Sequence, residues 1–255
     1  MKYNKLVLVI SNDNYFQPDY LANFIKILKG SKYKILKVFI YSPPKKKLQD
    51  FLLRNLFKLH LSEVYKLFVL KFFTSYINYF IKPKIKCFSL KKILVRNNIK
   101  FSFVKNINNR KIYNKIFKQN LIVVNTADQI FKKSIIKLFK FNIYNIHLSI
   151  LPRYGGRWTM FQQMSNNEKF TGLTLHKINS QIDAGKIVNQ KKFLLKKNYS
   201  LFENQLNCYK ELPLFLKKSL QKGLKIKKII KKSEYFDFPS NEDWIKFRIK
   251  KFKII

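Results

Sequence analysis

The chain has 255 residues, of which 47% are hydrophobic, and it carries a formal net charge of +40 at pH 7. Its length fits one large domain or a domain with an extension, and its hydrophobic content excludes global disorder. The positive charge is mostly lysine, since the arginines are limited to Arg54, Arg96, Arg110, Arg153, Arg157 and Arg248. Lysines spread along the whole chain favour a solvated surface over a nucleic-acid groove. A groove of that kind would favour arginine, whose planar guanidinium binds phosphates with two hydrogen bonds.

The cysteines and the N-terminal segment limit the other classes. Cys87 and Cys208 have no CxxC spacing and no nearby histidine pair, so neither a disulfide framework nor a zinc site is expected, and no metal is predicted. The apolar run at the N-terminus is too short for a signal peptide and indicates a buried strand. We therefore expect a cytoplasmic protein.

Strand and helix patterns alternate along the chain. Short β-branched runs predict strands at residues 6–11, 35–41, 101–104, 121–125 and 143–147. Helical spacing predicts helices at residues 19–28, 90–97, 134–139 and 200–220. This alternation is typical of an α/β fold with an open, mostly parallel sheet, whose ligands bind beyond the carboxyl ends of the strands.

Two segments depart from this alternation. Residues 51–81 are apolar with interspersed lysines and read as an insertion of one or two helices. We favour packing of these helices on the core over a basic amphipathic surface that lies weakly on an anionic membrane. In the C-terminal segment, Ser240 is expected to cap a last helix, with Glu242 and Asp243 in its acidic first turn.

Residues 145–185 contain four of the six glycines and two of the three histidines of the chain. Asn145 and His147 are two apart on a predicted strand and so point to the same face, where an amide beside an imidazole can hold a developing oxyanion. Asp183 next to His147 would favour the imidazolium and take part in proton transfer. Taken singly, each of these residues also has a structural explanation. For His176, which alternates with apolar residues, we slightly prefer a structural role.

The order and spacing of these residues resemble the folate-dependent formyltransferases, which include glycinamide ribonucleotide transformylase, methionyl-tRNA formyltransferase and the sugar N-formyltransferases. The resemblance rests on three blocks, Asn145-Ile-His147-x-Ser149-x-Leu151-Pro152, Thr171-Gly-x-Thr174-x-His176 and Ile182-Asp183-x-Gly185. It is clear from about residue 120 to 193 and fainter before that. The family's proline after the histidine is Leu148 here.

The resemblance implies a Rossmann-like formyltransferase domain over residues 1–195, with a helical insertion at about 47–82 and a helical C-terminal extension over 196–255. It implies 10-formyltetrahydrofolate as the formyl donor. Asn145, His147 and Asp183 match the family's catalytic residues. Gln129, Ile130 and Phe131 match the loop whose backbone holds the pterin, and Asp183 is also expected to contact the cofactor.

The acceptor implied is a primary amine, and the amino group of a nucleotide-linked sugar is the nearest choice. The first predicted strand lacks the glycines that cradle phosphate in the glycinamide ribonucleotide enzyme. The sixty residues after the domain are too few for the tRNA enzyme's C-terminal barrel. Methionyl-tRNA and glycinamide ribonucleotide formylation stay as alternatives, and a non-catalytic basic protein that binds nucleic acid or a membrane surface is the rival from another class.

Overall fold

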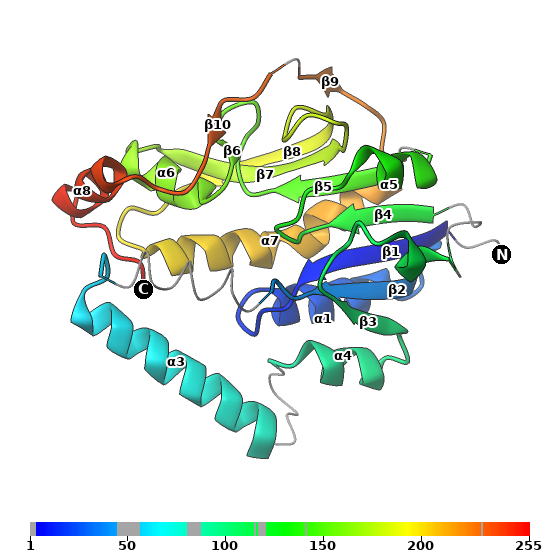
Figure 1. The fold of residues 1–255 in the computed structure, drawn as a ribbon, viewed down its shortest axis with the longest axis horizontal. Coiled ribbons are helices and arrows are strands. Elements are labelled where there is room, and N and C mark those ends of the chain that lie inside the picture. Colours follow the sequence, from blue (N-terminus) through cyan, green and yellow to red (C-terminus); the bar gives the residue numbers. More distant parts are fainter. Residues whose placement is uncertain are drawn as a thin grey trace.

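The computed structural model describes residues 4–44, 57–80, 88–114, 116, 121–140, 142–230 and 232–255. These residues form an eight-stranded sheet in the order β3-β2-β1-β4-β5-β7-β8-β9 (Figure 1). Its strands are β1 (Asn4–Ser11), β2 (Tyr33–Tyr41), β3 (Phe101–Val104), β4 (Leu121–Asn125), β5 (Ile143–His147), β7 (Phe170–Lys177), β8 (Lys186–Leu194) and β9 (Lys228–Ile229). A second sheet pairs β6 (Gly155–Gly156) with β10 (Tyr235–Phe236).

The strand directions divide the main sheet in two. Strands β3, β2, β1, β4 and β5 are parallel, whereas β5, β7, β8 and β9 pair antiparallel. The chain runs outward from β1 to β3 and then returns to β4 on the other side of β1, so the strand order reverses between β1 and β4. Ligands of open α/β sheets bind at the carboxyl ends of such a reversal. The predicted α/β class with a mostly parallel sheet is confirmed.

Alternating side chains of β1 supply the two cores. Leu6, Leu8 and Ile10 enter one apolar cluster, and Val7 and Val9 enter the other, as the two-residue period of a strand requires. The first cluster includes buried residues of α1 (Gln17–Leu28), α4 (Leu90–Arg96), α6 (Thr159–Ser165), α7 (Leu201–Gln221) and α8 (Asn241–Ile249). The second includes residues of α5 (Lys133–Leu138) and the 3-10 turn η1 (Arg110–Tyr113). Every strand and helix range predicted from the sequence has its counterpart here.

Both C-terminal helices begin at a serine cap. Ser200 accepts a hydrogen bond from the Glu203 N–H at the start of α7, and Ser240 accepts one from the Asp243 N–H at the start of α8. In each case the acidic side chain bonds back to the serine N–H, which completes a capping box. The cap predicted at Ser240 is confirmed. The division of the chain at residue 195 stays a prediction.

Helix α3 (Leu61–Phe80) lies in the predicted insertion, but it does not pack as expected. Most of its described large apolar side chains face solvent, among them Leu61, Phe68 and Phe72. The expectation that this segment packs on the core is therefore wrong for these residues, because spacing along a helix shows which residues share a face but not what covers it. Other parts of the predicted insertion fall in residues 45–56 and 81–87, which lie outside the described residues. Among the described helices, none is long and apolar enough to cross a membrane.

Candidate active site

Four side chains line up across the sheet near the carboxyl ends of β4 and β5. Asn125 of β4 pairs in register with Asn145 of β5, which pairs with His176 of β7. His147 follows Asn145 by two residues and therefore lies on the same face of the sheet. Because cross-strand neighbours have Cβ atoms about 5 Å apart, strand register alone brings these polar groups together.

Hydrogen bonds fix the orientation of the Asn145 amide. The backbone N–H of Ala127 donates to the side-chain oxygen of Asn125, so the Asn125 Nδ2 group is left to donate to Asn145 Oδ1, at 2.8 Å. The Asn145 Nδ2 group then points towards His176 Nε2, at 3.3 Å. An amide nitrogen carries two donors. Asn145, which is half-buried, thus has a second N–H to offer a ligand.

The two imidazoles meet different partners. His176 Nε2 lies 3.3 Å from Asn145 Nδ2 and 3.5 Å from Asp183 Oδ1, so this ring nitrogen faces both an amide and a carboxylate. His147 Nε2 lies 2.7 Å from the backbone oxygen of Tyr154, and a carbonyl can only accept, so this nitrogen carries a proton. The Nδ1 atom of His147 is the ring nitrogen that faces Asp183.

The motif residues Ser149 and Thr174 brace the loop that holds His147. The Ser149 hydroxyl donates to the Tyr154 carbonyl, at 2.9 Å, and the Thr174 hydroxyl donates to the Ser149 carbonyl, at 2.6 Å. Thr174 also accepts from the Leu151 N–H, at 3.1 Å. These residues therefore position the Tyr154 carbonyl, and through it the ring of His147.

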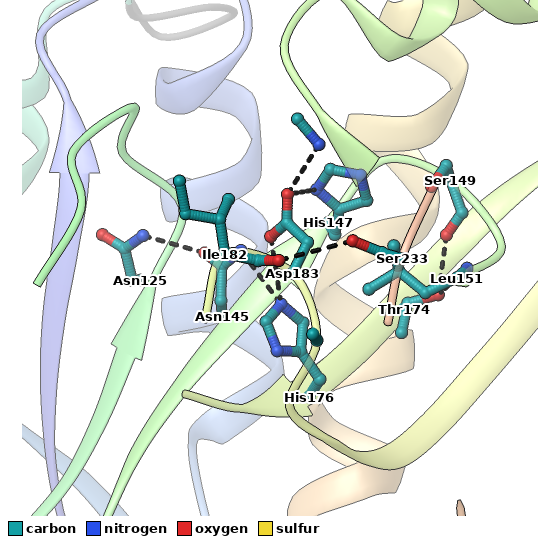
Figure 2. A network of polar contacts seen from close by, with 12 residues as sticks. Asn125, Asn145, His147, Ser149, Leu151, Thr174, His176, Ile182, Asp183 and Ser233 are labelled. Carbon is teal, nitrogen blue, oxygen red and sulfur yellow. Dashed lines mark hydrogen bonds and ion pairs between the residues drawn. The ribbon is translucent and has the colours of Figure 1, made fainter. Parts of the chain in front are cut away.

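Asp183 lies between the two imidazoles (Figure 2). Its Oδ2 is 3.6 Å from His147 Nδ1, and its Oδ1 is 3.5 Å from His176 Nε2. The backbone N–H of Gly156 donates to Oδ2, at 2.8 Å. Burial alone would raise the pKa of Asp183, but His147, His176 and the Gly156 N–H together hold this pKa well below its usual range. Asp183 is therefore a carboxylate in the folded protein.

Two glycines allow the backbone to come this close. A Cβ on Gly185 would meet the Lys177 carbonyl oxygen at 1.9 Å and His176 Nδ1 at 2.9 Å. A Cβ on Gly156, whose φ is +96°, would meet the Phe236 carbonyl oxygen at 2.0 Å. Only glycine fits both positions, which is why glycines gather in this segment.

The segment Gln129-Ile130-Phe131 follows β4 at the same edge of the sheet. The Gln129 side chain accepts from the Ile107 N–H, at 2.8 Å, and the Ile130 carbonyl accepts from the Asn108 side chain, at 2.9 Å. Phe131 is buried in the second core cluster, whereas the side chain of Ile130 is 58% exposed. The side chains of Gln129 and Phe131 thus hold the loop in place. The expected contact of this segment with a cofactor stays a prediction.

The structure brings together the three predicted catalytic residues, since Asn145 reaches His176, and both His176 and His147 reach Asp183. Their catalytic roles stay predictions. Sequence reasoning missed Asn125, whose only signal is an amide at the end of a predicted central strand. It also preferred a structural role for His176, which here contacts two of the three predicted residues. Among the described residues no cluster of metal-binding side chains is found.

The fold and site define an α/β domain with a polar site at the carboxyl ends of its parallel strands. Residues 93–206 match the formyl transferase family model. The chain is 32% identical over 144 residues to the bifunctional polymyxin resistance protein ArnA of Wigglesworthia glossinidia brevipalpis, and 33% identical over 95 residues to the methionyl-tRNA formyltransferase of Pseudothermotoga lettingae. These matches span 52% and 37% of this chain but only 22% and 28% of the two relatives.

Solved structures share the fold over a larger part of the chain. The sugar 3N-formyl transferase WlaRD superposes with a TM-score of 0.59 at 24% identity, over 93% of this chain and 70% of the other. The phosphoribosylglycinamide formyltransferase from Anaplasma phagocytophilum gives 0.60 at 16% identity, over 93% and 100%. These structures share the fold, and the segment that carries the site matches the formyl transferase family model, as the motifs predicted.

Proposed function

We propose that this protein transfers a formyl group from 10-formyltetrahydrofolate to a primary amine. The observation that carries the proposal is the convergence of an oriented amide, an imidazole and an ionised carboxylate on one face of the sheet, at the carboxyl ends of its parallel strands. These are the groups that an acyl transfer to an amine requires: donors for an oxyanion and a relay for a proton.

In the proposed reaction the acceptor amine attacks the formyl carbon of the folate, and the formyl oxygen becomes an oxyanion. The free N–H of Asn145 donates to this oxyanion. Because the Asn125 side chain donates a hydrogen bond to Asn145 Oδ1, the Asn145 N–H groups are oriented before the substrate binds. A donor that needs no reorganisation stabilises the transition state more than the ground state.

His147 supplies the second donor through Nδ1. Its Nε2 donates a hydrogen bond to the Tyr154 carbonyl. The 3.6 Å between Nδ1 and Asp183 Oδ2 is longer than a hydrogen bond, so Nδ1 can still donate to a ligand. The carboxylate stabilises a proton on Nδ1 and accepts the proton that the amine loses. As the intermediate collapses, the bond from the formyl carbon to the folate nitrogen breaks, and that nitrogen takes up the proton that the amine had given to the carboxylate.

Two fold neighbours support the folate as donor and an amino sugar as acceptor. WlaRD is described as a sugar 3N-formyl transferase in the presence of dTDP and 5-N-formyl-THF. The N-formyltransferase from Helicobacter canadensis is described in complex with folinic acid and dTDP-3-aminofucose. By this analogy the acceptor is a nucleotide-linked amino sugar. From the sequence resemblance we propose that the loop of Gln129, Ile130 and Phe131 holds the pterin, and that the protein is cytoplasmic.

Methionyl-tRNA is the second candidate acceptor. Several curated relatives at 31–33% identity are methionyl-tRNA formyltransferases, although each match spans no more than 41% of this chain. The high positive charge also suits a nucleic-acid substrate. The two candidates share the site chemistry and differ only in the acceptor.

The deciding experiment incubates the protein with 10-formyltetrahydrofolate and, separately, nucleotide-linked amino sugars, glycinamide ribonucleotide and methionyl-tRNA. Formylated product is measured by mass spectrometry, with His147→Ala as the matched inactive control. Product from an amino sugar alone supports the proposal, and product from the tRNA alone selects the second candidate. If no amine is formylated by a folded protein that binds the folate, formyl transfer is contradicted.

A further inference from the structure

Helix α3 presents an apolar stripe to solvent. The stripe is defined here by the large side chains of residues 61–73 that are 43–89% exposed, namely Leu61, Tyr65, Phe68, Val69, Phe72 and Phe73. At about 100° per residue these positions fall within roughly a third of the helix circumference. Exposed residues of this size are unremarkable singly, but a continuous patch of them marks an interaction surface.

The opposite side of α3 is tied to the rest of the protein. Glu63 is 3% exposed and forms an ion pair with Arg248 of α8, at 2.6 Å. Glu63 also accepts from the backbone N–H of Ile254, at 2.7 Å. About three turns along the helix from Glu63, Thr74 is 1% exposed. With Glu63 and Thr74 facing inward, the apolar stripe cannot turn towards the core.

Lysines border the stripe on both sides. By helical geometry Lys66 lies just beyond Phe73 on one edge, and Lys71 lies beyond Phe68 on the other. Both lysines are exposed. The acidic residue of the helix, Glu63, is the one that is buried against Arg248. A helix with an aromatic stripe between two cationic edges is the pattern of a segment that lies in a membrane interface, with its lysines reaching to the headgroups.

Charge decides between the two occupants that fit an apolar stripe. A second copy of this chain would bring a formal charge of +40 against +40, and this repulsion opposes association. An anionic bilayer has the complementary charge, and basic residues near such a surface strengthen binding. We propose that α3 docks this protein on an anionic lipid surface, with the stripe in the interface and the helix axis parallel to the membrane.

The experiment measures co-sedimentation of the full-length protein with vesicles of phosphatidylcholine alone and of phosphatidylcholine with phosphatidylglycerol. The variant Phe68→Glu/Phe72→Glu changes the stripe, and Val95→Glu/Ile229→Glu is the matched control. The control changes two exposed apolar residues on α4 and β9, and it alters the net charge equally. We expect binding to the anionic vesicles to weaken about tenfold or more in the stripe variant and to change little in the control, because burial of even one Phe is typically worth a factor of ten.

A second measurement places the helix itself. Phe68→Trp should show quenching by brominated lipid, and Ile229→Trp should add no quenching to the background of Trp158 and Trp244. Equal loss of binding in both double variants would mean that charge alone attracts the protein, which overturns the proposal. So would a stripe variant that turns a dimer into a monomer in sedimentation while the wild type binds no vesicles, since the occupant would then be a second copy.

Discussion

The amide of Asn145 is held by its neighbours before any substrate arrives. Asn125 fixes its oxygen, and His176 lies at its nitrogen. We expect Asn145→Ala to lower turnover on the order of a hundredfold to a thousandfold, because a donor that acts mainly in the transition state is lost. Asn189→Ala, which removes an amide of β8 that bonds to Ser219, is the control for folding. Unchanged formyl transfer in Asn145→Ala would remove this residue from the mechanism.

Asp183 makes stability depend on pH. Its pKa is lowered in the folded protein, so the carboxylate stabilises the fold fully above the unfolded value of 3.8, and this contribution declines as the pH falls below that value. Asp183→Asn should therefore be less stable than the wild type at pH 6, and the difference should narrow towards pH 3. Denaturant midpoints of both proteins across this range measure it. If the stability difference between the two proteins stays constant or widens towards pH 3, the folded protein does not lower the pKa of Asp183.

The sequence predicted which residues form the site better than it predicted how they are held. Asn145, His147 and Asp183 could be chosen because residue type, spacing and family motif agreed. Asn125 could not, since its role depends on the register between β4 and β5. The Tyr154 carbonyl that fixes His147 is a backbone atom of a loop, and no side-chain pattern in the sequence reports it.

At the scale of elements, the pair β6–β10 joins the C-terminal segment to the site. The Gly156 N–H that bonds Asp183 belongs to β6, and β10 lies against it. A helix cap such as Ser240 was predictable from local sequence, but two-residue strands such as these are too short to show any periodicity. The antiparallel turn of the sheet at β7 was missed for a related reason, because alternation gives the faces of a strand and not its direction.

Gly156 gives a test of this pairing with an internal control. Gly156 and Gly30 both have positive φ, at +96° and +73°, but a Cβ at Gly30 would meet nothing within 4 Å. Gly30→Ala should cost only the backbone strain, about 1–2 kcal/mol. Gly156→Ala should cost more, because the Phe236 carbonyl must move, and it should also lower formyl transfer. Thermal melts and activity of both variants measure this, and equal losses would refute a specific role for β6.

At the scale of the whole molecule, the role of the positive charge distinguishes formyl transfer to an amino sugar from the functions that require binding to nucleic acid. The groups proposed for chemistry are an amide, an imidazole and a carboxylate, and Asp183 would repel a phosphate brought directly against it. If the lysines form a solvated surface, binding to nucleic acid should be weak, independent of sequence and quickly lost with salt, since the Debye length is about 8 Å at physiological ionic strength. Formyl transfer to an amino sugar should be unaffected by added DNA.

We would titrate the protein with a labelled tRNA and a labelled DNA duplex of similar length across a salt series, and measure formyl transfer in the same solutions. Equal affinity for both, falling steeply with salt, is the expected result, because counterion release depends on the number of phosphates neutralised and not on their sequence. Saturable tRNA binding that survives physiological salt, together with formylation of methionyl-tRNA, would assign the charge to substrate recognition. Tight tRNA binding with no formyl transfer to any amine would favour a non-catalytic protein on a formyltransferase fold.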